Sequence, residues 1–162
     1  MSALKLQIEE FDAIDFQLIA IHTALEDYRL AYYINQVLCT NLAKCQSQIN
    51  IKSNVGETSF GHFGFEDIKK DTYWNLIQNK TQILSSKKQR GLGLFSDTES
   101  HTLTKVYLLP EYRKVDYFLK IENINEQEYM NTLVSKINTI ERINTVYLID
   151  PEKIKSKNNL IF

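Results

Sequence analysis

The sequence predicts one α+β domain over residues 1–162, with an antiparallel or mixed sheet and two main helices packed on it. Short runs rich in β-branched and aromatic residues recur along the chain between turn residues, which is typical of strands. Two longer stretches, 24–38 and 125–140, repeat apolar residues at helical spacing. The length suits one hydrophobic core, and no linker, internal repeat or low-complexity tract divides it.

Two strands are expected before the first helix. Leu4, Leu6 and Ile8 alternate with polar residues, so this segment is expected to form a strand with one face in water. Residues 15–21 lose strict alternation, which indicates a strand buried on both faces. The core is therefore expected to form around this second strand, at the centre of the sheet.

The first helix is expected over residues 24–38. Thr23 and Glu26 stand three residues apart, so hydroxyl and carboxylate would each satisfy a free N–H group in a capping box. Three tyrosines on this helix either complete the core or offer an aromatic surface to a partner, because tyrosine is enriched at interfaces. The three tyrosines are Tyr28, Tyr32 and Tyr33.

A polar loop over 39–48 and a short strand over 49–52 are expected after the helix. The segments 60–65 and 72–77 are rich in aromatic residues and are expected to pair as a hairpin. Aromatic rings on such strands are able to stack on nucleic-acid bases. The rings considered for this contact are those of Phe63, Phe65, Tyr73 and Trp74.

The stretch from 80 to 97 shows little periodicity and contains several Ser and Gly residues, which predicts a long loop. Its part from 80 to 93 is basic and holds no acidic residue. The cations of such a loop suit either RNA phosphates or an acidic protein. The basic residues considered for this contact are Lys80, Lys87, Lys88 and Arg90.

A second hairpin, with a charged tip, is expected over 105–121. The runs 105–109 and 115–121 are typical of strands. Pro110 has no N–H group to donate to a ladder, so the first strand is expected to end there. The chain is then expected to turn through residues 111–114.

Residues 109–117 read Leu-Pro-Glu, three further residues, and then Val-Asp-Tyr. In this motif the sequence resembles a bacterial family named for it, the IPExxxVDY family, with Leu109 in place of the leading Ile. The segments 27–30 and 150–162 extend the resemblance along the chain. The resemblance implies a bacterial protein and no particular activity.

A second helix and a last strand are expected after the motif. Asn125 as the cap and Glu128 three residues later predict the start of the helix. A strand over 145–149 follows, and Pro151 suits the first position of a brief helical turn. The apolar residues 160–162 are expected to pack back on the body. The outer order of strands and helices is similar to that of a ferredoxin-like core with an inserted hairpin.

The composition argues against several classes of function. The net charge is −1, from 19 Lys plus Arg and 20 Asp plus Glu, which gives no overall attraction to nucleic acid or membranes. No apolar run has the length of a signal-peptide core or a membrane span, so a cytoplasmic protein without membrane contact is expected. Cys39 and Cys45 are expected to be free thiols, and no Cys or His spacing predicts a metal or cofactor.

We expect a non-enzymatic binding or adaptor protein for another protein. One alternative is an RNA-associated factor that uses the basic 80–93 loop and the aromatic strands. Another is an enzyme of unrecognised type in which Glu111 and Asp116 share a proton or a metal ion. The sequence assigns no catalytic residue and no oligomeric state. The motif residues expected to contact a partner are Pro110, Glu111, Arg113, Lys114, Asp116 and Tyr117.

Overall fold

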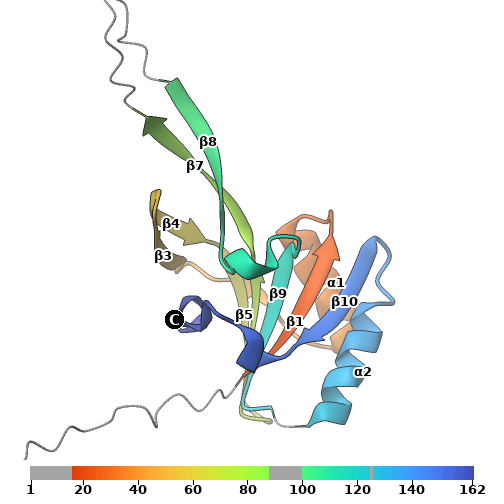
Figure 1. The fold of residues 1–162 in the computed structure, drawn as a ribbon. Coiled ribbons are helices and arrows are strands. Elements are labelled where there is room, and N and C mark those ends of the chain that lie inside the picture. The colour runs from red at the N-terminus through yellow and green to blue at the C-terminus, as the bar shows by residue number, and fades with distance from the viewer. Residues whose placement is uncertain (1–15, 88–99, 125) are drawn as a thin grey trace, which may run out of the picture.

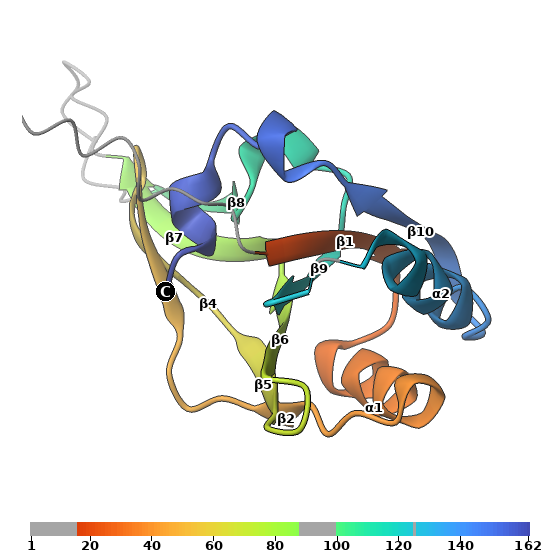
Figure 2. The same ribbon diagram turned by 90° about the horizontal axis from the view of Figure 1, so that it is seen from below.

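A six-stranded antiparallel sheet forms the centre of the molecule, in the order β10-β1-β9-β6-β5-β2 (Figures 1 and 2). The computed structural model describes residues 16–87, 100–124 and 126–162. β1 and β9 are neighbours in the middle of the sheet, and both are buried along most of their length. The strands are β1 (Phe16–Thr23), β2 (Ala43–Lys44), β5 (His62–Asp67), β6 (Thr72–Gln78), β9 (Tyr117–Glu122) and β10 (Ile143–Ile149).

Four of these strands have the connectivity of a ferredoxin-like core. β1 leads through α1 (Asp27–Leu38) toward β6, and β9 leads through α2 (Gln127–Ile137) to β10. In the sheet, β9 lies between β1 and β6, and β1 lies between β9 and β10. Each of these neighbouring strands pairs antiparallel with the next. Each helix therefore joins two parallel strands across an antiparallel neighbour, which is the split βαβ arrangement. The predicted α+β class and this core arrangement are confirmed.

Two ribbons of two strands each are inserted into this core. β3 (Ile49–Ser53) and β4 (Gly56–Phe60) follow α1 and lie on the side of the sheet away from the helices (Figure 2). β7 (Lys80–Lys87) and β8 (Ser100–Tyr107) connect β6 to the motif and extend away from the sheet (Figure 1). The motif itself therefore begins where the second ribbon returns to the body.

Apolar side chains form one core on each face of the sheet. On the first face, α1 and α2 pack side by side over the sheet (Figure 2). We call the opposite face the second face. It is covered by the β3–β4 ribbon, the motif and the segment after β10. Its buried residues include Leu18, Ala20, Ile49, Ile51, Phe60, Ile77, Leu108, Leu109, Val115, Phe118, Ile149, Ile154 and Leu160.

The hairpin predicted over 105–121 is wrong. β8 pairs with β7, whereas β9 lies between β1 and β6. Five of the six residues of β9 are buried, so this strand takes a central place in the sheet. Three of the six described side chains of β8 are instead exposed, and only Val106 is buried. Burial, rather than closeness in sequence, decides which strands pair.

The loop predicted over 80–97 is also wrong for its first part, because Lys80–Lys87 form β7. Residues 88–97 lie outside the described residues. The predicted capping box is wrong as well. Thr23 ends β1, where its hydroxyl accepts a hydrogen bond from the Leu25 N–H at 3.1 Å and donates to the Arg142 carbonyl at 2.8 Å. α1 begins later, at Asp27, with no side-chain cap.

The other predicted elements agree with the structure to within a few residues, except that the polar loop over 39–48 contains the short strand β2. Pro151 begins a short helical turn, and the Asp150 side chain accepts the Glu152 N–H at 3.1 Å. Leu160 is fully buried as predicted, but Ile161 is 67% exposed and Phe162 is 53% exposed. The strand predicted over Leu4 to Ile8 and the cap Asn125 lie outside the described residues.

Candidate functional site

The motif forms a tight turn that packs against the second face of the sheet. A short 3-10 helix, Pro110–Tyr112, starts the turn with proline at its beginning, where the backbone N–H would be free in any case. The Tyr112 N–H donates to the Leu109 carbonyl, and the Val115 N–H donates to the Tyr112 carbonyl, both at 3.0 Å. Leu109 and Val115 are buried. The motif is therefore anchored on the body and does not project as a hairpin tip.

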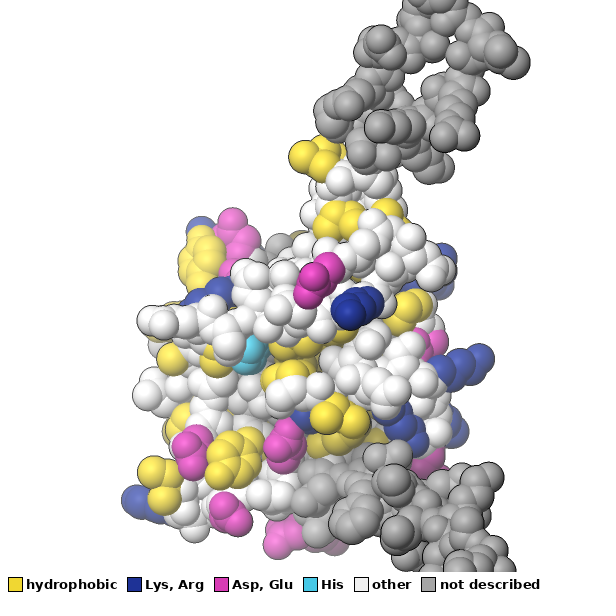
Figure 3. Space-filling model, turned by 90° about the vertical axis from the view of Figure 1, so that its left-hand side faces the viewer, with side chains coloured by type: hydrophobic (Ala, Val, Ile, Leu, Met, Phe, Trp, Pro, Cys, Tyr) yellow, Lys and Arg dark blue, Asp and Glu magenta, His cyan; other side chains and the backbone are white. Residues whose placement is uncertain are grey.

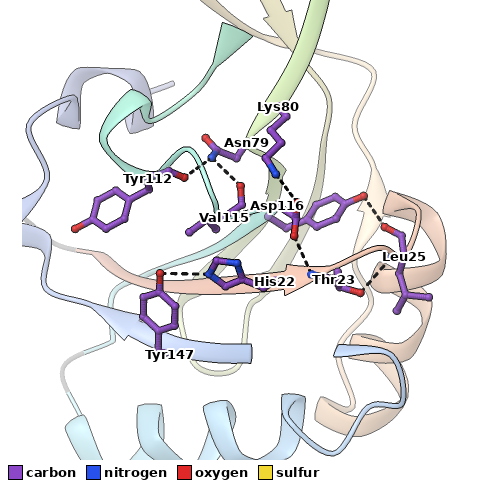
Figure 4. A network of polar contacts seen from close by, with 10 residues as sticks. His22, Thr23, Leu25, Asn79, Lys80, Tyr112, Val115, Asp116 and Tyr147 are labelled. Carbon is purple, nitrogen blue, oxygen red and sulfur yellow. Dashed lines mark hydrogen bonds and ion pairs between the residues drawn. The ribbon is translucent and has the colours of Figure 1, made fainter. Parts of the chain in front are cut away.

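Asn79, between β6 and β7, holds this turn from inside the protein (Figure 4). Its Nδ2 donates to the carbonyls of Tyr112 and Val115, both at 2.9 Å. Its Oδ1 accepts the N–H of Leu109 at 3.0 Å. The backbone N–H of Asn79 donates to the Asp116 carbonyl at 2.9 Å. One fully buried amide therefore satisfies three backbone groups of the motif turn that would otherwise be unpaired.

Asp116 and Tyr117 connect the motif to the start of the first helix (Figure 4). The Asp116 carboxylate accepts the Thr23 N–H at 3.0 Å and the Lys80 ammonium group at 2.6 Å. The Tyr117 hydroxyl donates to the Leu25 carbonyl at 2.8 Å. Burial, with smaller contributions from neighbouring carboxylates, raises the pKa of Tyr117 to about 12. Both side chains are thus used to hold the connection between β1 and α1.

Glu111 points to a different part of the chain. Its carboxylate accepts the N–H groups of Lys155 and Ser156, both at 2.8 Å, and the Ser156 hydroxyl at 3.0 Å. Burial alone would raise the pKa of Glu111, but hydrogen bonds from Ser156 and Lys155 outweigh it and hold that pKa below its usual range. Glu111 and Asp116 therefore have separate partners. Among the residues that the structure describes, no group of three His, Cys, Asp or Glu is placed to hold a metal ion.

A pocket of about 330 Å³ lies beside the motif turn. Arg113 and Lys114, at its edge, are exposed. The Arg113 guanidinium lies 5.9 Å from the centre of the Tyr107 ring, and no salt bridge joins either cation to another described residue. We call this the motif pocket. Its lining includes Pro110, Glu111, Tyr112, Arg113, Lys114 and Tyr147.

The two tyrosines of the motif pocket lie on the second face of the sheet. The Tyr147 hydroxyl is 3.4 Å from the Nε2 of His22, and the two rings stack with their centres 5.7 Å apart (Figure 4). Burial raises the pKa of Tyr112, with smaller contributions from Glu111 and Asp150. Burial also raises the pKa of Tyr147. Tyrosine hydroxyls are ordinarily protonated at neutral pH, and a raised pKa keeps both of these able to donate hydrogen bonds at higher pH as well.

The basic residues predicted to contact RNA do not form a described patch. Lys80 is paired with Asp116. The side chain of Lys87, together with Lys88 and Arg90, lies outside what the structure describes. On the side of the molecule that carries β3 and β4, described side chains of both charges lie among hydrophobic ones (Figure 3). The described surface on this side therefore does not offer the single-sign track that binds a phosphate backbone.

The four aromatic residues predicted to stack on bases are not gathered on one surface. Phe63 and Trp74 are buried under the helices, and Phe65 packs against the same core. The Trp74 indole N–H is already used, since it donates to the Thr72 hydroxyl at 3.0 Å. Tyr73 alternates with Trp74 along β6 and is 39% exposed. The stacking surface on which the RNA alternative depended is therefore absent among these four residues.

Sequence reasoning did not identify Asn79, Tyr112, His22 or Tyr147 as part of the site. Asn79 follows a predicted strand, where asparagine is usually a turn residue in water. His22 lies within β1, near its end. His22 and Tyr147 are 125 residues apart in the chain and meet because β1 pairs with β10. Only the strand pairing places these two rings together, so no local pattern could have found them.

A second exposed feature is the outer side of α1. Tyr28 and Tyr32 are 55% and 58% exposed, and Tyr33 is 39% exposed. Their contacts are mostly within the helix: the Tyr28 hydroxyl donates to Glu26 at 2.7 Å, and the Gln36 amide donates to the Tyr32 hydroxyl at 2.9 Å. The tyrosines therefore contribute little to the core and stand where a partner could contact them.

No family model, curated protein or solved structure matches this chain. The resemblance to the IPExxxVDY family therefore stays a prediction from residues 109–117. Within the described ranges, no helix combines the length and the apolar character that crossing a membrane requires.

Proposed function

We propose that this chain is a non-enzymatic cytoplasmic protein that binds another protein, and that the motif pocket is where the partner docks. The observation that carries the proposal is the contrast between the two kinds of motif residue. Asp116 and Tyr117 are used internally, and Glu111 is bonded to residues 155 and 156. Arg113 and Lys114 have no such internal role, and both stand at the edge of a pocket.

The anchoring of the pocket supports recognition of a partner. Leu109, Val115 and Asn79 fix the backbone of the turn before any partner arrives. A surface that is already ordered loses little conformational entropy on binding, so more of the contact energy appears as affinity. The exposed tyrosines of α1 add a second surface of the kind that protein interfaces favour.

The two alternatives receive less support. RNA binding depended on stacking rings of which Phe63 and Trp74 are buried. An enzyme built on Glu111 and Asp116 needed the two carboxylates to act on one group, but each accepts hydrogen bonds from a different part of the chain. These observations favour binding of a protein over both alternatives.

Site-specific photo-crosslinking in cells tests the proposal. A photoreactive amino acid replaces Arg113 in one tagged chain, in which Lys114 remains to contact the partner, and Lys52 in another. Lys52 is an exposed cation on β3 that does not line the motif pocket and therefore serves as the matched control. We expect a protein adduct that forms from position 113, survives nuclease treatment and is absent from position 52.

Two other outcomes have clear meanings. An adduct from position 113 that disappears with nuclease would replace the proposal with the RNA alternative. No adduct of any kind from position 113, while the chain is folded and expressed, would overturn the motif pocket as a docking site.

A further inference from the structure

The charged residues that line the described pockets differ from one pocket to the next. A pocket of about 290 Å³ before α1 is lined by Arg29 and Arg142 and by one acid, Glu26, which pairs with Arg29 at 3.3 Å. A pocket of about 350 Å³ beside the β5–β6 turn is lined by Lys70 and also by Glu126, so its charges balance. The motif pocket has two cations, Arg113 and Lys114, and one acid, Glu111. The Glu111 carboxylate already accepts three hydrogen bonds from Lys155 and Ser156. The net charge that a ligand would meet is therefore positive.

The uncharged groups of the pocket suit the same kind of ligand. Tyr112 and Tyr147 line the pocket, and their hydroxyl groups are protonated at neutral pH, as tyrosine hydroxyls ordinarily are. Hydrogen bonds to ionised groups are about twice as strong as those between neutral groups. An anion placed between the cations and these phenols would therefore receive both ionic and hydrogen-bonded contacts.

The size of the pocket limits the ligand to a small group. Ligand pockets generally measure about 300–1,000 Å³, and the motif pocket is at the lower end of that range. It has room for a side chain or two of a partner. Asp and Glu carboxylates are the anionic side chains that an unmodified protein partner offers to a group of this size.

We infer that the motif pocket takes the carboxylates of an Asp- or Glu-rich segment on the partner protein, with Arg113 and Lys114 as its charged contacts. This inference rests on the proposed function and specifies the partner's chemistry. Guanidinium groups bind carboxylates through paired N–H groups, whereas the ammonium group acts as a point charge. Arg113 is thus expected to fix the orientation of the bound carboxylate as well as to attract it.

Fluorescence anisotropy with three labelled peptides of one sequence pattern tests the inference. The first peptide is rich in Glu, the second has Gln at the same positions, and the third has phosphoserine there. We expect saturable binding of the Glu peptide to the full chain at low ionic strength and no binding of the Gln peptide. Replacing Arg113 and Lys114 together by Gln is expected to weaken binding of the Glu peptide at least about tenfold.

The matched control replaces two exposed lysines outside the pocket, Lys52 and Lys69, by Gln, which changes the net charge equally. We expect this control to weaken binding less than about twofold. Equal losses in both variants would show attraction to net charge only and would overturn the inference. Failure of the Glu peptide to bind, or equal binding of the Gln peptide, would also overturn it. Tighter binding of the phosphoserine peptide would replace the carboxylate by a phosphate.

Failure of this inference can be separated from failure of the proposed function. If the protein adduct from position 113 forms but the partner is still retained by the Arg113 and Lys114 double variant, the docking site stands and the carboxylate ligand is wrong. If position 113 gives no protein adduct, the docking site itself is wrong.

Discussion

The Glu111 carboxylate binds Ser156 twice, through the backbone N–H at 2.8 Å and through the hydroxyl at 3.0 Å. Nearby, the Asn159 amide donates to the Leu108 carbonyl at 2.7 Å, just before the motif turn. The motif and the segment after β10 are thus parts of one structural unit.

Replacing Glu111 by Gln is expected to destabilise the fold by about 1 kcal/mol at neutral pH. The amide oxygen keeps the hydrogen bonds from the N–H groups of Lys155 and Ser156, but the NH₂ group replaces the oxygen that accepts the Ser156 hydroxyl, and the negative charge is lost. The estimate is small because Glu111 is an exposed residue, where solvent replaces part of what is lost. Urea unfolding followed by circular dichroism measures the change, and Glu152→Gln, on the same surface, is the control with an expected change within about 0.5 kcal/mol.

The pH dependence of this effect has a definite sign. The pKa of Glu111 is lowered in the folded state, so folding favours its ionised form. Its contribution is therefore present above the usual carboxyl pKa of about 4.3 and is lost as pH falls through the folded value. We expect the stability difference between the wild type and Glu111→Gln to shrink on acidification. A difference that stayed constant would show that the carboxylate charge is not what holds Ser156.

Replacing Asn79 by Ala is expected to cost about 3 kcal/mol or more, because three buried backbone groups lose their partner together. These groups are the N–H of Leu109 and the carbonyls of Tyr112 and Val115. Urea unfolding of this variant, beside the exposed control Asn144→Ala, measures the cost. A loss below about 1 kcal/mol would mean that water replaces the amide and that the turn is not held by Asn79.

The elements that the sequence predicted well are those with a strong burial pattern. Apolar residues at helical spacing placed α2, and a continuous apolar run placed β1 at the centre of the sheet. β7 was not predicted because the ribbon that it forms with β8 has little buried surface: the facing residues Leu84 and Leu103 are 69% and 63% exposed. Without a buried face, no alternation of apolar and polar residues is imposed on the strand.

The candidate site was predictable only in part. The turn at Pro110 followed from local chemistry, but the partner of β9 did not, because pairing depends on which strands are buried. The separate roles of Glu111 and Asp116 depend on Ser156 and Thr23, residues distant in the chain that only the fold brings near. Arg113 and Lys114 were predicted as contact residues from the motif alone, while the pocket beside them required Tyr147 from another strand.

Replacing Tyr117 by Phe is expected to cost about 1–2 kcal/mol at neutral pH, because the Leu25 carbonyl loses its hydrogen-bond donor. The pKa of Tyr117 is raised to about 12, so the folded state keeps a proton that the unfolded chain releases near pH 10. The free energy of unfolding of the wild type should therefore fall as pH rises from about 10 to about 12. Its difference from that of Tyr117→Phe should become smaller over the same range. Tyr32→Phe, with an exposed ring, is the control. A difference in the free energy of unfolding that stayed constant at alkaline pH would contradict the burial of the Tyr117 hydroxyl.

Two neighbouring residues of the final segment differ in role, since one packs in the core and the other lies at the surface. Leu160 is fully buried in the core of the second face, whereas Ile161 is mostly exposed. Leu160→Ala is therefore expected to cost about 2–5 kcal/mol and Ile161→Ala less than about 0.5 kcal/mol. The Lys120 ammonium group donates to the Leu160 carbonyl at 2.6 Å, a contact that both variants keep. Thermal and urea unfolding of the pair thus compare side-chain packing alone, and equal losses would show that Ile161 also packs on the body.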